Sequence, residues 1–126
     1  MRKYYLFNIK SELNRIFRHN PYGLYKTIED LYDIKRIKYE VALYNELCDL
    51  IDSSSIKYYI ENTFNYNKNK DKYLLGNTLI EVNRSCVVVE SEYNIPDIFK
   101  TLGIYSKNFL VIDFYNNDYF WLNKFI

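Results

Sequence analysis

The C-terminal part of the chain holds two apolar, aromatic-rich runs, residues 109–114 and 119–122, on either side of Asn116 and Asn117. Asparagine tolerates the left-handed backbone conformation that tight hairpin turns require. Two such runs around such a turn are typical of a β-hairpin. The only tryptophan, Trp121, lies on the second run, so we predict that it is a core residue of a sheet. Its expected neighbours are sheet residues that include Phe109 and Val111.

Further strands and helices are predicted along the rest of the chain. The runs 4–9, 78–82 and 86–90 indicate strands, and residues 83–85 join the last two as a tight hairpin. Apolar side chains at helical spacing predict helices. These helices are expected from Ser11 as N-cap to Phe17, from Asn20 as cap through the stripe Leu24, Ile28, Leu31 and Tyr32, over 34–51, and from Ile95 to Gly103.

Two segments give weaker patterns. Residues 52–55 are expected to end the helix over 34–51, and residues 56–64 fit either a helix or a strand. Residues 65–72 are rich in Asn, Lys and Asp and are expected to form a solvated loop. Because short links between strands require antiparallel pairing, the whole order predicts a single α+β domain, a mainly antiparallel β-sheet packed with several α-helices.

Length, charge and cysteine content limit the class of protein. A chain of 126 residues with 48% hydrophobic residues is typical of one domain with a proper core. Proteins that bind duplex DNA or anionic membranes usually carry a clear excess of basic residues, and the net charge of this chain is only +1. Cys48 and Cys86 lie far apart, and no signal peptide or membrane-spanning run is recognisable. We therefore expect a cytoplasmic protein with reduced thiols and no membrane partner.

The sequence offers few candidates for catalysis. With a single histidine, His19, neither a nucleophile–histidine triad nor a histidine-based metal site is expected. Asp113 and Asp118 bracket the predicted hairpin turn, where aspartates usually bond to their own backbone. Glu81 and Glu90 are interpreted as solvent-facing residues of a hairpin. We predict no enzyme activity, no cofactor, no metal and no small-molecule substrate; a hydrolase built on Asp113 and Asp118 is one alternative.

The helical first half of the chain suggests another alternative. Basic side chains are interleaved there with tyrosines, a composition that can stack on and neutralise single-stranded nucleic acid. The residues concerned are Arg15, Arg18, Lys26, Lys35, Arg36, Lys38, Tyr22, Tyr25 and Tyr39. A small nucleic-acid-binding module is therefore the second interpretation, beside a solvated helical face.

The predicted first helix carries an apolar stripe that is large for its length. Leu13, Ile16 and Phe17 follow at the spacing i, i+3 and i+4. A helix of two turns can bury only part of such a stripe, so either all three residues are core or the exposed part anchors a protein partner. We place Ile16 toward the core and predict that Phe17 is partly exposed.

The two ends of the chain resemble a known family. The run FLVIDF at 109–114, followed by YFWLN at 119–123, resembles the C-terminal end of SirA, the sporulation inhibitor of replication of endospore-forming bacteria. The residues Tyr4, Tyr5, Phe7, Ile9, Lys10 and Glu12 look like the first strand of that family and the start of its first helix. Between 33 and 72 the likeness is limited to hydrophobic spacing.

The resemblance implies a single SirA-like domain over residues 1–126 that is not an enzyme. Members of that family bind the N-terminal domain of the replication initiator DnaA and inhibit the initiation of chromosome replication at the onset of sporulation. Their contact surface includes the first helix, where the aligned positions are typically aromatic. In this chain those positions are Leu13 and Phe17, and Phe17 keeps the aromatic character. The resemblance thus implies protein binding through Leu13 and Phe17, with the DnaA N-terminal domain as partner and no direct contact with nucleic acid.

Overall fold

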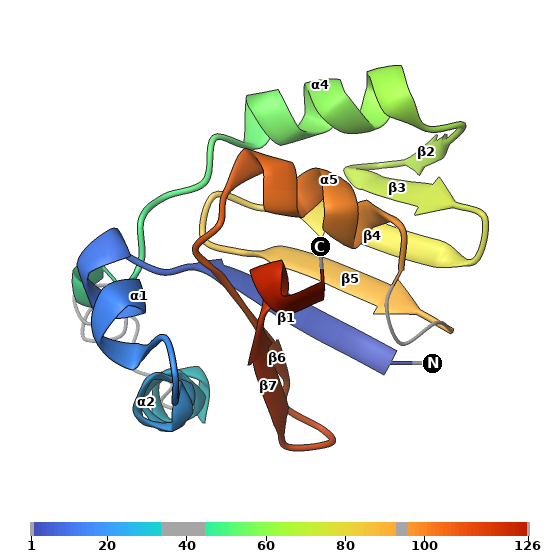
Figure 1. Ribbon diagram of the computed structural model, residues 1–126. Helices are drawn as coiled ribbons and strands as arrows, with labels where there is room; N and C mark the ends of the chain where they lie inside the picture. Colours follow the sequence, from blue (N-terminus) through green and yellow to red (C-terminus); the bar gives the residue numbers. More distant parts are fainter. Residues whose placement is uncertain (1, 34–44, 93–95, 126) are drawn as a thin grey trace.

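The computed structural model describes residues 2–33, 45–92 and 96–125, which form one seven-stranded sheet covered by helices (Figure 1). The strand order is β2-β3-β4-β5-β1-β6-β7, and every neighbouring pair is antiparallel. The strands are β1 (Arg2–Asn8), β2 (Asn67–Asn69), β3 (Lys72–Leu75), β4 (Thr78–Val82), β5 (Val87–Ser91), β6 (Phe109–Asp113) and β7 (Asp118–Trp121). The predicted α+β class with a mainly antiparallel sheet is confirmed.

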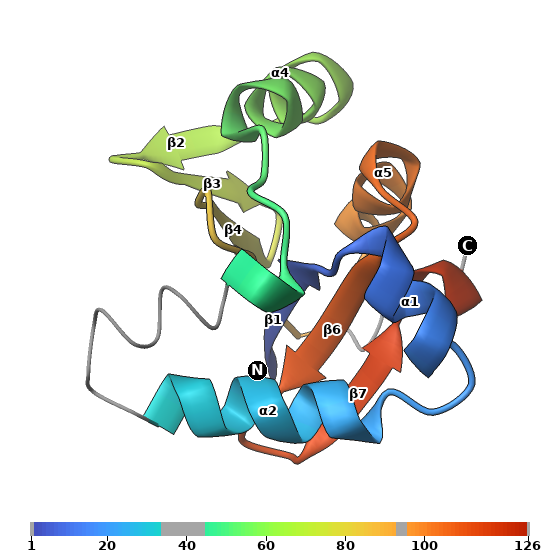
Figure 2. The same ribbon diagram turned by 90° about the vertical axis from the view of Figure 1, so that its left-hand side faces the viewer.

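Helices cover both faces of the sheet. They are α1 (Ser11–Phe17), α2 (Tyr22–Asp33), α4 (Ser53–Thr63), α5 (Ile98–Tyr105) and the 3₁₀ helix η1 (Leu122–Phe125). Figures 1 and 2 show α4 and α5 together on one face, while α1 and α2 lie over the strands β1, β6 and β7 on the other. None of the helices in the described ranges is long and apolar enough to cross a membrane.

The strand β1 separates two hydrophobic cores because its side chains alternate between the faces of the sheet. Tyr4 and Leu6 are fully buried in the first core, which α4, α5 and η1 cover. Phe7 belongs to the second core, which lies under α1 and α2. The buried members of the second core are Phe7, Ile9, Leu24, Tyr25, Ile28, Cys48, Leu110, Ile112 and Trp121. A central strand that is apolar on both faces thus fixes the three-layer arrangement.

Both predicted hairpins are confirmed. The strands β6 and β7 pair from Leu110 opposite Trp121 to Asp113 opposite Asp118, and Asn117 in the turn has a φ of 52°. That left-handed conformation is the one that asparagine tolerates. The strands β4 and β5 are joined by a turn closed by a hydrogen bond from the backbone N–H of Asn83 to the carbonyl of Cys86.

Trp121 is buried as predicted, with 3% of its surface exposed, but its predicted neighbours are wrong. It lies opposite Leu110 and packs in the second core with Ile112. Phe109 and Val111 face the first core on the other side of the sheet. The physical reason is the two-residue period of a strand, which places Leu110 and Phe109 on opposite faces.

Several predicted boundaries need correction. Ser11 is the first residue of α1, and Lys10 takes the N-cap position without a side-chain hydrogen bond. Asn20 does cap α2, because its Oδ1 accepts from the backbone N–H of Tyr22 at 3.1 Å. The helix α5 continues through Gly103 to Tyr105, since its C-terminal turn is closed by the Ser106 N–H rather than by a glycine.

The predicted helix over 34–51 falls partly outside the described residues, which exclude 34–44. Residues 45–47 are helical, but Cys48 forms a β-bridge with Ile9, so the helical segment ends before Ile51. Asp52 begins the next element instead of ending the last one. Its carboxylate accepts from the Ser55 N–H at 3.4 Å and caps α4, so residues 56–63 are helical and Phe64 is the C-cap with an extended backbone.

Residues 65–72 are exposed as predicted, but the prediction that they form a loop is wrong. This segment contains β2 and the start of β3, which pair as a hairpin with Lys70 at a φ of 58° in the turn. All three residues of β2 are exposed, so no apolar alternation marks the strand in the sequence. Its position at the edge of the sheet, beside β3, explains how so polar a segment pairs at all.

Candidate protein-binding surface on the first helix

The short helix α1 is held in place at both ends. At its start, the backbone N–H of Lys10 donates to the carbonyl of Leu47 at 2.9 Å. At its end, the indole Nε1–H of Trp121 donates to the carbonyl of Phe17 at 3.2 Å. A helix of this length is marginal on its own, so these tertiary contacts position it.

The structure places the three apolar residues of α1 differently from the sequence prediction. Leu13 and Phe17 are half-buried and pack against the second core, whereas Ile16 is 72% exposed. The prediction that Ile16 points toward the core is therefore wrong. Leu13 and Phe17, four residues apart, share the sheet-facing side, and Ile16 lies about 100° around the axis from Phe17. The prediction that Phe17 is partly exposed is confirmed.

The ring of Phe17 fits closely against the start of α2. A Cβ atom added at Gly23 would lie 3.1 Å from Cε1 of Phe17. Because Gly23 has no side chain, α2 can pack closely against the ring of Phe17. Part of the Phe17 side chain remains accessible. We refer to Leu13, Ile16 and Phe17 together as the α1 patch.

The α1 patch differs from other exposed apolar positions. Ile104 on α5 and the adjacent Tyr58 and Tyr59 on α4 are also exposed, but each of these helices buries other apolar residues in the first core. No residue of α1 is buried, so its whole apolar stripe is at least partly accessible. Scattered exposed hydrophobic residues are ordinary, whereas an apolar stripe that its own fold leaves unburied is typical of a contact surface.

Asp113 and Asp118 are brought together by one arginine. Arg2 Nε donates to Asp113 Oδ2 at 3.0 Å, and Arg2 Nη2 donates to Asp118 Oδ2 at 2.9 Å. The backbone and side chain of Asn116 also donate to the Asp113 carboxylate. Burial raises the pKa of Asp113, but the hydrogen bonds from Asn116 and Arg2 outweigh it, and the pKa is lowered overall. A general acid needs a raised pKa, and the pKa of Asp113 is lowered instead. The hydrogen bonds from Arg2 tie together the two ends of the β6–β7 turn.

Two of the proposed nucleic-acid residues, Tyr25 and Lys26, are engaged in contacts within the protein. The Tyr25 hydroxyl donates to Glu29 Oε2 at 2.6 Å, and its ring stacks on Tyr119 with centroids 4.5 Å apart. Burial, followed by the bond to Glu29, raises the pKa of Tyr25 to about 12. Lys26 pairs with Glu29 at 2.9 Å. Tyr22 is exposed, as are Arg15 and Arg18, whereas Lys35, Arg36, Lys38 and Tyr39 lie outside the described residues.

The remaining candidates for reactive groups are the two cysteines and the two glutamates of the β4–β5 hairpin. Neither Cys48 nor Cys86 forms a disulfide, and burial raises the pKa of Cys86 to about 11, which keeps its thiol protonated at neutral pH. Glu81 lies opposite Val88, and Glu90 lies opposite Leu79, so the two glutamates are not directly paired. In the ranges that the structure covers, no three His, Cys, Asp or Glu side chains gather as a metal site.

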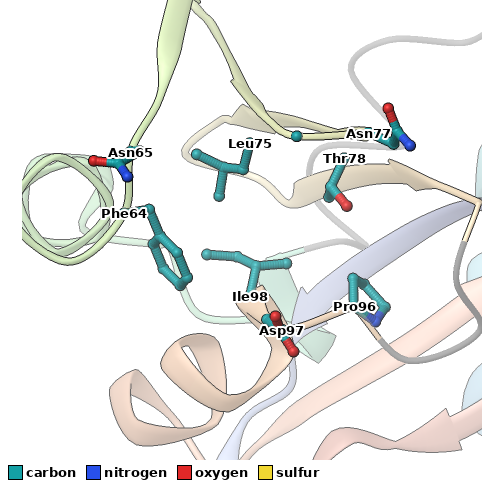
Figure 3. Close-up of a pocket in the computed structure, with 9 residues that line it drawn as sticks. Phe64, Asn65, Leu75, Asn77, Thr78, Pro96, Asp97 and Ile98 are labelled. Carbon is teal, nitrogen blue, oxygen red and sulfur yellow. The ribbon is translucent and has the colours of Figure 1, made fainter.

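A cavity of about 510 Å³ opens between the end of α4, the turn joining β3 to β4 and the start of α5 (Figure 3). Phe64, Leu75 and Ile98 give it an apolar lining, and Asn65, Asn77 and Asp97 add polar groups. Asp97 is the one titratable side chain among these lining residues. The lining residues come from three separate segments, so no local motif in the sequence predicts this cavity.

Comparison with known proteins adds no family assignment: no family model matches the chain, and no curated protein matches it. The resemblance to SirA rests on the residues at the two ends of the chain. The structure places most of those residues in β1, β6 and β7, three neighbouring strands that carry the second core beneath α1 and α2, and places Glu12 in α1 and Leu122 and Asn123 in η1.

Proposed function

We propose that this protein is a SirA-like inhibitor of chromosome replication initiation that binds the N-terminal domain of DnaA at the onset of sporulation. The observation that carries the proposal is the α1 patch, in which Ile16 is 72% exposed beside half-buried Leu13 and Phe17. The resemblance of both chain ends to that family supports the choice of partner. Leu13 and Phe17 remain the contact residues that the resemblance implies, and the exposure of Ile16 adds a third.

The proposed mechanism is steric and needs no chemistry. A rigid helix that is fixed at both ends loses little conformational entropy on binding, because it is already ordered in the free protein. Its central apolar residue can then act as an anchor surrounded by partly exposed neighbours. Occupying a surface of the DnaA N-terminal domain in this way blocks the contacts that the same surface makes during initiation.

A titration tests the proposal directly. Isothermal calorimetry of the full chain with the isolated DnaA N-terminal domain is expected to give saturable binding. A mobility-shift assay with single- and double-stranded DNA serves as the competing test. Tight DNA binding that weakens steeply with salt, together with no measurable binding to the DnaA domain, would contradict the proposal and favour a nucleic-acid-binding module.

The chain offers a matched control for the contact surface. Ile104 is 80% exposed on α5, which packs on the other face of the sheet, and it has the same side chain as Ile16. Ile16→Ala is expected to weaken binding about tenfold or more, as truncation of an anchor residue does. Ile104→Ala is expected to leave the affinity unchanged. Equal losses in the two variants would place the contact surface elsewhere.

A further inference from the structure

A second surface of α1 is basic and concave. Arg15 of α1, Arg18 at its C-cap and Lys107 from the loop between α5 and β6 line an open cavity of about 370 Å³. The remaining lining residues are polar and uncharged: Ser11, Asn14, Asn108 and Asn123. Ser11, Asn14 and Arg15 of α1 and the C-cap Arg18 are spaced i, i+3, i+4 and i+7, so they form one stripe along the helix and its C-cap. Ile16 is not part of this stripe.

The three cations of this cavity lack a carboxylate counterpart in the described ranges of the chain. Some basic residues elsewhere in the protein form ion pairs with acids, as Arg2 and Lys26 do. No described carboxylate forms an ion pair with Arg15, Arg18 or Lys107, and no acidic residue lines the cavity. Like charges gathered in one concave site repel each other and raise the local positive potential, which favours an anion.

The polar floor of the cavity is ordered by side-chain hydrogen bonds. Asn14 Nδ2 donates to Asn108 Oδ1 at 2.7 Å, and Asn108 Nδ2 donates to Ser11 Oγ at 2.9 Å. The backbone N–H of Ile9 donates to the carbonyl of Asn108 at 3.0 Å, which fixes the loop to the end of β1. Because the Ser11 oxygen accepts from Asn108, its own O–H remains able to donate to a bound group.

We propose that this cavity binds the phosphate group of a small phosphomonoester. Two guanidinium groups and an ammonium group suit a compact dianion, whereas a single carboxylate needs only one of them. The volume lies at the lower end of the range for small-molecule sites. A nucleic-acid backbone requires a track of cations along a groove, and the net charge of +1 leaves little for one. The proposal is independent of the DnaA-binding proposal, because it uses another stripe of α1.

Thermal unfolding with glycerol 3-phosphate as the probe tests this site. The unfolding midpoint of the full chain is expected to rise saturably with the probe, at constant ionic strength held with sodium chloride. Inorganic phosphate is expected to give a weaker saturable shift, and acetate none. A shift that fails to saturate, or one that acetate reproduces, would overturn the proposal, because either result describes general screening of charge.

Substitutions of the lining residues test whether the probe binds in this cavity. The double variant Arg15→Gln/Arg18→Gln is expected to weaken binding of the probe about tenfold or more, since charge-assisted bidentate hydrogen bonds are lost. Arg84→Gln, which changes an exposed arginine in the turn between β4 and β5, is the matched control and is expected to bind as the unaltered chain does. The midpoint without probe is expected not to fall in the double variant, which separates loss of the site from loss of the fold. Equal binding by the double variant, or tighter binding of a single-stranded oligonucleotide than of the probe, would overturn the proposal.

Discussion

Replacing Trp121 with alanine is expected to lower the free energy of unfolding by about 5 kcal/mol. The side chain is almost fully buried between β6 and the helices α1 and α2. Losing roughly 150 Å² of buried apolar surface at about 25 cal/mol per Å² costs about 4 kcal/mol. Losing the hydrogen bond to the Phe17 carbonyl, which measures 3.2 Å, adds about 1 kcal/mol. The sum lies at the upper end of measured core truncations, and in a domain of this size it lowers the unfolding temperature by about 20 °C.

Urea unfolding followed by far-ultraviolet circular dichroism measures this loss. Fluorescence is unsuitable, because Trp121 is the only tryptophan. Trp121→Phe keeps most of the buried surface but removes the indole donor, so it is expected to cost only about 1–2 kcal/mol. If the alanine variant unfolds at the same urea concentration as the unaltered chain, the second core does not depend on this residue and the reasoning fails.

Three further predictions concern the α1 patch and two titrating side chains. Ile16→Ala is expected to leave the thermal midpoint almost unchanged, because Ile16 is exposed. Phe17→Ala is expected to lower the free energy of unfolding by about 1–3 kcal/mol, because the ring packs on the second core. Equal thermal midpoints for the two variants would contradict this. The lowered pKa of Asp113 stabilises the fold at neutral pH, and this contribution is lost as the pH falls below about 4, so acid unfolding of Asp113→Asn should be less steep than that of the unaltered chain. The pKa of Tyr25 is raised to about 12, so its contribution is complete below the unfolded pKa of about 10 and is lost as the pH rises toward that of the folded state. Urea unfolding of Tyr25→Phe from pH 9 upward should therefore show a smaller alkaline loss, and an identical slope would count against the assignment.

The sequence predicted those elements whose signals are local. Asn116 and Asn117 indicate a hairpin because asparagine tolerates the left-handed backbone conformation of such turns, which Asn117 adopts. The stripe Leu24, Ile28 and Leu31 is buried, as its helical spacing predicts. The hairpin of β2 and β3 was not predictable in the same way. Its first strand has no buried residue, so pairing with a neighbour, and not its own pattern, determines its structure.

The candidate site likewise combines features that local sequence predicts with features that depend on contacts between distant residues. The spacing of Leu13, Ile16 and Phe17 predicts a helix with an apolar stripe, but it does not fix the rotation of that helix on the sheet. Contacts from distant residues fix the rotation, among them the bond from Trp121 and the close approach at Gly23. The basic cavity likewise depends on Lys107, which is far from α1 in the sequence and reaches it only through the fold.

Hydrogen–deuterium exchange of the full chain, with and without the DnaA N-terminal domain, tests the central claim most directly. The claim predicts that the partner slows exchange of the backbone amides of α1, residues 11–17, and leaves those of α4 unchanged. Exchange slowed only in α4 and the β2–β3 hairpin, or slowed nowhere at saturating partner, would contradict it.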